Sequence, residues 1–425
     1  MRTSRPQDPP IDRGRVSIGS GWAAGDCRIL AAMRSLAAVA GALAGLTLAG
    51  CGDDPARPGR SATATATVSP ARMPDAAAAP SQRRAVRLTI AVSGDLLPHL
   101  PIVARARALA RGGERYDFAP LFRELRPLVR GADLALCHVE TPLVPGPPAG
   151  YPLFRTPPAL ARAIRRTGWD ACSTASNHTL DAGQAGVEST LRALDRARVR
   201  HTGSYASRRA RLRPLILRAR GVRVAFLAYT TTTNGIPPPH PWSVNIAHPG
   251  RVLRDARRAR RAGAQVVLVN LHWGTEFSHV VDGQQRRLAR RLMRSRAVSA
   301  LVGQHAHVVQ PIRRVRGKWV VFGEGNLLSN QSGACCAAAA QDGLVAVLRL
   351  RVQGRRARVE RIRYTPTWVR HPDYTVLPAG RARRASWRRT VAIVGRARGL
   401  RPAPARLPRS RIRAARRPAS PRANE

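Results

Sequence analysis

The chain has 425 residues and a formal net charge of +49. Its basic residues are arginines except for a single lysine, Lys318. A charge this large indicates a polyanionic neighbour, such as acidic lipid headgroups or an acidic cell-envelope polymer. The arginines are spread along the chain without interleaved aromatic residues, and high genomic GC content also enriches arginine. The composition therefore argues against a nucleic-acid partner.

The first segment with a readable pattern is a signal peptide. Met33 and Arg34 form a short basic start, residues 36–47 are an apolar run, and small residues precede Cys51, which is the order of a secretory signal. The run is too short to span a bilayer as a helix. Its Leu-Ala-Gly-Cys end resembles a bacterial lipobox, which implies lipidation of Cys51 and a location on the extracytoplasmic face of the bacterial cell membrane. A buried N-terminal helix with a chance cysteine is the alternative.

Composition divides the chain into four parts. Residues 1–50 hold an upstream extension, which suggests a misassigned start codon, and the signal peptide; 51–85 are a disordered tether; 86–379 are the folded domain; and 380–425 are a basic Arg/Pro-rich tail, partly helical around an apolar island. The length without its ends fits one large domain or two small ones.

From residue 86 onward, short apolar runs alternate with amphipathic segments. The runs predict strands at 86–93, 134–138, 169–174, 222–229, 265–271, 300–302 and 319–322. The amphipathic segments predict helices at 121–129, 159–166, 186–196, 251–261 and 284–293. Two longer alternating segments, 344–352 and 357–364, predict an antiparallel hairpin. This alternation indicates an α/β fold.

Four cysteines lie beyond the signal and the lipidation site. Cys335 and Cys336 are adjacent, and none of the four makes a zinc-type Cys-x-x-Cys pair. Cys137 and Cys172 each come near the end of a predicted strand, so neighbouring strands could bring them together. A disulfide in an oxidising compartment and two buried free thiols both remain open.

Polar side chains follow five of the predicted strands. They are, in chain order, Asp95, Glu140, the group Asn177, His178 and Asp181, the pair His272 and Glu276, and the pair His305 and His307. Because ligands bind beyond the carboxyl ends of the strands in open α/β sheets, we expect these side chains to converge on one site.

The residue types in this set point to metal chemistry. Carboxylate, amide and imidazole ligands together suit two divalent metal ions of Mn, Fe or Zn. Two ions about 3.5–4 Å apart clamp the attacking and leaving oxygens of a displacement at phosphorus, so phosphate ester hydrolysis is the expected reaction. Taken singly, the motifs have simpler explanations: Asn177 and Asp181, for example, could cap the helix that begins near residue 183.

The ordered motifs also resemble a known family. Gly94-Asp95, Glu140-Thr141-Pro142-Leu143, Ser176-Asn177-His178, His272-Trp273-Gly274-Thr275-Glu276, Gln304-His305-Ala306-His307 and Gly325-Asn326 are similar to motifs of the calcineurin-like metallophosphatase superfamily, and of its CapA branch of poly-gamma-glutamate capsule biosynthesis proteins. The resemblance covers about residues 86–331. It implies a four-layer α/β/β/α sandwich with a dinuclear metal site between the sheets.

The resemblance implies a role for each site residue. Asp95 and His307 would bind the first metal, Glu140 would bridge both, Asn177, His272 and His305 would bind the second, and His178 would be the general acid. His99 is a possible further ligand of the first metal at an unusual spacing, while Asp181 and Glu276 would orient His178 and His272 as hydrogen-bond acceptors. The sequence departs from the branch at His138, where an asparagine is usual.

The expected function is that of a lipid-anchored extracytoplasmic phosphoesterase linked to capsule or cell-envelope polymer biosynthesis. Its partners would be the membrane, through the lipid anchor, and an anionic polymer or phosphorylated substrate. Two alternatives stay open: a non-catalytic polymer-binding accessory of capsule synthesis or export, and a metal-dependent amide hydrolase. The residues 230–241, rich in Thr and Pro, are a candidate loop over the site.

Overall fold

The computed structural model describes residues 84–380 and 383–403. The predicted signal peptide, the lipidation site at Cys51, almost all of the tether and the end of the tail lie outside these ranges. Everything described below belongs to the unit that includes residues 84–403.

The first sheet has nine strands and contains the predicted hairpin. Its main order is β14-β13-β12-β1-β2-β3-β4, with β11 beside β1 and β15 beside β13. The strands are β1 (Val86–Leu97), β2 (Leu134–Val139), β3 (Ala171–Ser173), β4 (Arg200–Thr202), β11 (Asn326–Ser329), β12 (Asp342–Gln353), β13 (Arg356–Arg370), β14 (Thr375–Pro378) and β15 (Leu400–Pro402). Strands β1 to β4 are parallel, whereas β12 and β13 form the antiparallel hairpin that the alternating pattern predicts.

The second sheet has six strands in the order β5-β6-β7-β8-β10-β9. They are β5 (Leu215–Ala219), β6 (Val222–Thr230), β7 (Val266–Trp273), β8 (Ala300–His305), β9 (Ile312–Val315) and β10 (Lys318–Val321). Strands β6, β7, β8 and β10 are parallel, so their carboxyl ends lie along one edge. Every residue of β7 and β8 is buried, as expected of parallel strands covered on both faces.

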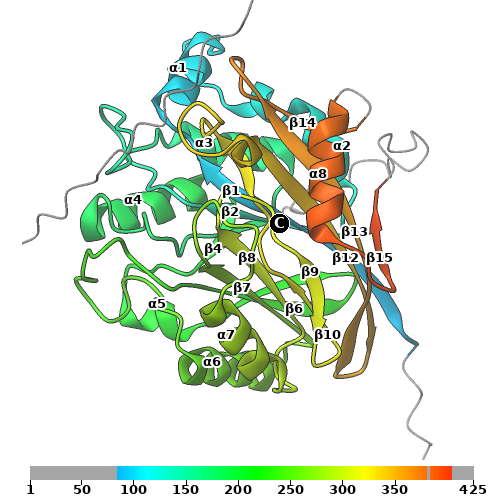
Figure 1. Ribbon diagram of the computed structural model, residues 1–425. Helices are drawn as coiled ribbons and strands as arrows, with labels where there is room; N and C mark the ends of the chain where they lie inside the picture. Colours follow the sequence, from blue (N-terminus) through cyan, green and yellow to red (C-terminus); the bar gives the residue numbers. More distant parts are fainter. Residues whose placement is uncertain (1–83, 381–382, 404–425) are drawn as a thin grey trace, which may run out of the picture. The chain divides into compact units, whose positions relative to one another are not determined.

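Helices cover the outer faces of both sheets (Figure 1). They are α1 (Leu100–Ala108), η1 (Ala119–Leu125), α2 (Arg126–Arg130), α3 (Ala159–Thr167), α4 (Gly183–Arg196), α5 (Arg208–Leu212), α6 (Pro249–Arg261), α7 (Gly283–Met293), η2 (Ala338–Gln341) and α8 (Arg384–Val394). Among the helices of the described ranges, none combines the length and the apolar character needed to cross a bilayer.

Three apolar clusters define the layers. Leu88 and Ile90 of β1 pack with Phe226 of β6 and Leu268 of β7, so one cluster fills the space between the sheets. A second cluster joins the outer face of the first sheet to η1, α2 and α3. A third joins the outer face of the second sheet to α6 and α7, as when Val252 packs with the strand residues. The result is the expected α/β/β/α order.

Two elements differ from the sequence-based expectation. The helix predicted at 121–129 is a 3₁₀ segment followed by the short α2, because Pro127 has no amide hydrogen with which to continue the ladder. The folded unit also extends past residue 379: α8 and β15 pack on the first sheet, with Val394 and Leu400 buried (Figure 1). The high Arg and Pro content of this stretch masks its few apolar residues.

The register of β2 on β3 brings two of the cysteines together. Cys137 of β2 lies directly opposite Cys172 of β3, with Cα atoms 4.4 Å apart, and the two form a disulfide. Cys335 and Cys336 are free and exposed.

Candidate metal centre

The expected residues converge where the carboxyl ends of the two sheets meet. In the first sheet, Asp95 of β1 lies opposite His138 of β2 and Asn326 of β11. In the second sheet, Trp273 of β7 pairs with His305 of β8. The backbone amide of His305 donates a hydrogen bond to Asp95 Oδ2 at 3.3 Å, which ties the two sheets together at the site.

The position of Asp95 depends on a close approach between two backbone segments. A Cβ atom on Gly94 would lie 1.8 Å from the carbonyl oxygen of Gly325, so only glycine fits between the two segments. The amide of Asp95 then donates to this same carbonyl oxygen at 3.1 Å. The Gly-Asp motif therefore fixes the carboxylate against the turn that precedes Asn326.

The His-x-His turn has an unusual backbone. His305 and His307 have φ angles of 92° and 55°, in the left-handed region that non-glycine residues rarely adopt. Such conformations cost about 1–3 kcal/mol each and gather at functional sites. Here they turn both imidazoles toward the acidic residues of the first sheet.

One group of ligand atoms surrounds Asp95. Suitable atoms of Asp95, Glu140 and His307 all lie within 4.8 Å of one another. His307 Nδ1 is 3.5 Å from Asp95 Oδ2, and its Nε2 is 3.7 Å from Glu140 Oε1. Nδ1 also lies 3.1 Å from Oδ1 of Asn326, whose amide nitrogen already donates to Ala340. Asn326 therefore accepts from Nδ1, which leaves Nε2 of His307 to face Glu140.

A second group forms on the other side of Glu140. His272 Nε2 lies 2.8 Å from Asn177 Oδ1 and 3.7 Å from Glu140 Oε1. The rings of His272 and His305 have centroids 4.6 Å apart. Both His307 Nε2 and His272 Nε2 thus lie 3.7 Å from Glu140 Oε1, so Glu140 borders both groups.

These groups leave buried polar atoms without partners. Within the described part of the chain, the atoms without hydrogen-bond partners include Asp95 Oδ1, both carboxylate oxygens of Glu140, His138 Nε2, His272 Nδ1 and His305 Nδ1. An unpaired buried polar group costs about 1–3 kcal/mol. Because most of these atoms are acceptors, cations placed among them would offset that cost. The residues therefore fit divalent metal ions.

Burial and mutual charge shift the pKa values at the site. Burial raises the pKa of Glu140 well above its ordinary value, and the charge of Asp95 adds to this. Burial lowers the pKa of His272 well below its ordinary value and that of His305 to about 4. Burial also opposes protonation of His307, but the carboxylates of Glu140 and Asp95 outweigh it and raise its pKa to about 9. The positive charge that the carboxylates attract would come from the metal when one is bound.

His178 is held by an acid but lies outside the ligand groups. Its Nδ1 is 2.8 Å from Asp181 Oδ2, which also accepts from the amide of Phe154 at 2.8 Å. The N-cap residue of α4 is Ala182, and no side chain caps this helix. The simpler explanation of Asp181 as a helix cap therefore does not hold. Its carboxylate instead contacts the His178 ring, which packs edge-on against Phe154.

Two expected residues occupy other positions. His99 Nδ1 lies 3.0 Å from the carbonyl oxygen of Leu97, and its ring packs against Phe154, away from the ligand groups. Glu276 does not orient His272 as expected. Its Oε1 lies 3.9 Å from His305 Nδ1 and 3.8 Å from His307 Nε2, because the loop after β7 turns toward the His-x-His segment.

The loop between β6 and α6 reaches the site, as its position in the sequence suggested. Asn177 Nδ2 donates to Asn234 Oδ1 at 3.2 Å. Sequence reasoning gave no role to His138 or Asn326, although both border the Asp95 group. A signal for His138 was available, because it precedes Glu140 by two residues and so points to the same face of β2.

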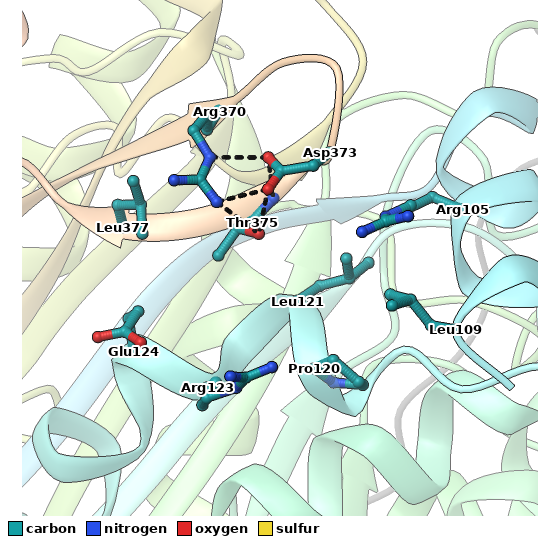
Figure 2. Close-up of a pocket in the computed structure, with 10 residues that line it drawn as sticks. All are labelled: Arg105, Leu109, Pro120, Leu121, Arg123, Glu124, Arg370, Asp373, Thr375 and Leu377. Carbon is teal, nitrogen blue, oxygen red and sulfur yellow. Dashed lines mark hydrogen bonds and ion pairs between the residues drawn. The ribbon is translucent and has the colours of Figure 1, made fainter. Parts of the chain in front are cut away.

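A pocket of about 380 Å³ lies elsewhere, between α1, η1 and β14 (Figure 2). Its lining includes Arg105, Arg123 and Glu124. The ion pair between Arg370 and Asp373, drawn with dashed lines in Figure 2, neutralises part of its charge. The lining contains none of the histidines of the site, so this pocket is separate from the metal chemistry.

Comparison with known proteins agrees with these motifs. Residues 89–331 match the family described as bacterial capsule synthesis protein PGA_cap. The capsule biosynthesis protein CapA of Bacillus anthracis is 23% identical over 269 residues, which cover 60% of this chain and 63% of that protein. The PGA biosynthesis protein CapA of Bacillus subtilis is 24% identical over 228 residues, covering 50% and 57%. The chain thus spans less than two thirds of either relative.

Among solved structures, the calcineurin-like phosphoesterase YfkN from Bacillus subtilis is similar, with a TM-score of 0.44 and 13% identity over 67% of this chain and 91% of that one.

Proposed function

Because the chain belongs to the bacterial capsule synthesis protein family PGA_cap, we propose that it is a metal-dependent phosphoesterase of capsule or cell-envelope polymer biosynthesis. The observation that supports this most directly is the set of buried, unpartnered acceptor atoms around Glu140. Such atoms are costly in a folded protein unless something binds there.

The residues divide into two ligand sets. Asp95 and His307 would hold the first ion, and Asn177, His272 and His305 the second, with Glu140 between them. When bound, two divalent ions would polarise a phosphoryl oxygen and lower the pKa of a water molecule. All the other contributions come from side chains of the chain itself.

His178 is the proton donor in this proposal. Asp181 accepts from Nδ1 and fixes the orientation of the ring, so that in its doubly protonated form the ring can deliver the Nε2 proton to the leaving oxygen. Contact with Phe154 restricts the ring further. His178 is 5% exposed, so its ring is shielded from bulk water.

The test uses the full-length chain, extracted in detergent. We expect two equivalents of bound metal and Mn²⁺-dependent hydrolysis of p-nitrophenyl phosphate or bis(p-nitrophenyl) phosphate. His305→Ala should lose metal and turnover together. His178→Ala should keep its metal but lose about 10²–10⁴-fold in kcat, the usual contribution of a positioned acid.

His201→Ala is the matched control, because His201 pairs with Asp195 outside the site and should behave as wild type. Bound metal without turnover on either ester would contradict the phosphoesterase proposal and favour amide hydrolysis or polymer handling.

The proposal includes attachment to the membrane. Cys51, at the end of the lipobox-like segment, would carry the lipid and hold the domain on the extracytoplasmic face of the cell membrane. Expression of the full chain and of Cys51→Ser in a bacterial host, followed by membrane fractionation, tests this. Wild type should sediment with membranes and the variant should not; equal distribution of the two would contradict the anchor.

The second candidate function is a polymer-binding accessory role. It is favoured by the basic surface of α6 and α7, which lie together on the outer face of the second sheet (Figure 1). Exposed arginines there include Arg254, Arg257, Arg287 and Arg291, and the one acid of the two helices, Asp255, is buried. Salt-dependent binding of poly-glutamate that survives His178→Ala, with no esterase activity in wild type, would support this role.

A further inference from the structure

His138 is a buried histidine at the metal centre to which neither the motifs nor the family match assigns a role. It lies on β2 with 0% exposure, two residues before Glu140. The parallel pairing of β1 with β2 places it directly opposite Asp95. Its Nε2 has no hydrogen-bond partner within the described residues and lies 3.8 Å from Asp95 Oδ1, which is also unpartnered.

The other ring nitrogen, Nδ1, has a hydrogen-bond partner. His138 Nδ1 lies 2.6 Å from Ser173 Oγ, and the Ser173 hydroxyl donates to the carbonyl oxygen of Cys137 at 3.4 Å. When the hydroxyl donates its hydrogen there, it accepts from the imidazole, and Nδ1 carries the hydrogen in that arrangement. Nε2 is left with a lone pair that points toward Asp95.

Two acceptors therefore face each other across a short, buried gap. A lone pair of imidazole and a carboxylate oxygen repel each other unless a cation or a proton lies between them. Ligand atoms of Asp95, His138 and His272 all fall within 4.8 Å of one another, the spacing that a metal ion requires. In metal-binding histidines, one ring nitrogen commonly donates a hydrogen bond to a fixed acceptor while the other ring nitrogen binds the metal.

We propose that His138 binds, through Nε2, the metal ion held by Asp95. This inference rests on the metal centre of the proposed function. It assigns to β2 an imidazole for the first metal, whereas His99 belongs to none of the ligand groups found among the described residues. Ser173 is then a positioning residue, which holds the ring without touching the metal.

The assignment has a consequence for metal choice. The group of Asp95, His138 and His272 and the group of Asp95, Glu140 and His307 share Asp95, so His138 would add a second imidazole beside His307 to the ion that Asp95 holds. Imidazole suits Zn, Fe and other later transition metals, whereas carboxylate-rich sites suit Mg and Mn. We expect the first site to discriminate against Mg²⁺ more strongly than a site with a single imidazole.

The experiment compares full-length wild type with His138→Ala and His138→Asn. Metal content after dialysis is measured by elemental analysis, and Mn²⁺ affinity by titration with EPR detection. His138→Ala should lose one of two equivalents, or bind it at least about 10–100-fold more weakly, the range already found for outer-sphere partners. Asparagine can itself bind metal through its amide oxygen, so His138→Asn is judged by the count of bound nitrogens. Pulsed EPR of the Mn²⁺-loaded wild type should show one more directly bound imidazole nitrogen than His138→Asn.

Two further variants make the result specific. Ser173→Ala should weaken Mn²⁺ binding by less than His138→Ala, because the ring remains present but is less well oriented. His201→Ala should match wild type. His138→Asn retains a polar side chain of similar reach, so it keeps the test valid if His138→Ala does not fold.

The outcomes separate the two proposals. Suppose that wild type binds two equivalents of metal and that His138→Asn has the same stoichiometry, affinity and nitrogen count. This result would overturn the role of His138 and leave the proposed function intact. Wild type that binds no metal under replete conditions would overturn both.

Discussion

Metal binding by this protein should depend steeply on pH, because protons occupy the site when metal does not. The carboxylates of Glu140 and Asp95 outweigh burial and raise the pKa of His307 to about 9. At pH 7 the ring is then deprotonated in only about one molecule in a hundred. A metal ligand must be deprotonated, so binding to His307 has to release this proton.

The size of the pH effect on metal affinity follows from the number of protons that binding releases. Below the pKa of His307, each unit of pH should change the apparent metal affinity by about tenfold for one released proton. Between pH 6.5 and 8.5 the affinity should therefore rise by about 100-fold. Glu140, whose pKa burial raises, shares this proton with His307 and does not add a second one, because only the ionised carboxylate raises the pKa of His307.

Isothermal titration calorimetry with Mn²⁺ under argon measures both quantities. Titrations at several pH values give the slope, and buffers of different ionisation enthalpy give the number of protons released. His307→Gln should bind more weakly with a shallower slope, and His201→Ala should reproduce wild type. An affinity that is constant from pH 6.5 to 8.5, with no proton release, would refute the reasoning about His307.

Three further predictions concern the acid, the disulfide and the C-terminal elements. Asp181→Asn should lower kcat by at least about tenfold without loss of metal, because His178 loses its orienting acceptor; unchanged steady-state kinetics would exclude that role. Cys137→Ser removes the bond to Cys172 and should lower the free energy of unfolding by about 2–4 kcal/mol in urea titrations, whereas a wild-type midpoint under oxidising conditions would contradict it. Ending the chain at residue 380 exposes the apolar surface under α8 and β15. Losing the burial of two large side chains there should lower the free energy of unfolding by about 3–6 kcal/mol. A thermal midpoint equal to that of wild type would argue that these elements do not stabilise the domain.

Strand periodicity and motif order are enough to locate the site along the chain. Asp95, Glu140, His272 and His305 can be found because each lies at the carboxyl end of a buried apolar run, and parallel strands bring such ends to one edge. The α/β/β/α layering is expected from the family resemblance, and the packed clusters confirm it. These features depend on local pattern and chain order, which a sequence displays directly.

What only the tertiary structure decided are the contacts between segments distant in the chain. The register of β2 on β3 joins Cys137 to Cys172, and the register of β1 on β2 turns His138 toward Asp95. The turn after β7 carries Glu276 to the His-x-His segment. Register and loop direction depend on how whole sheets pack, and a one-residue shift would point each side chain to the opposite face. The sequence by itself therefore located most of the residues that meet at the candidate metal centre, whereas packing added His138 and Asn326 and determined the partner of each one.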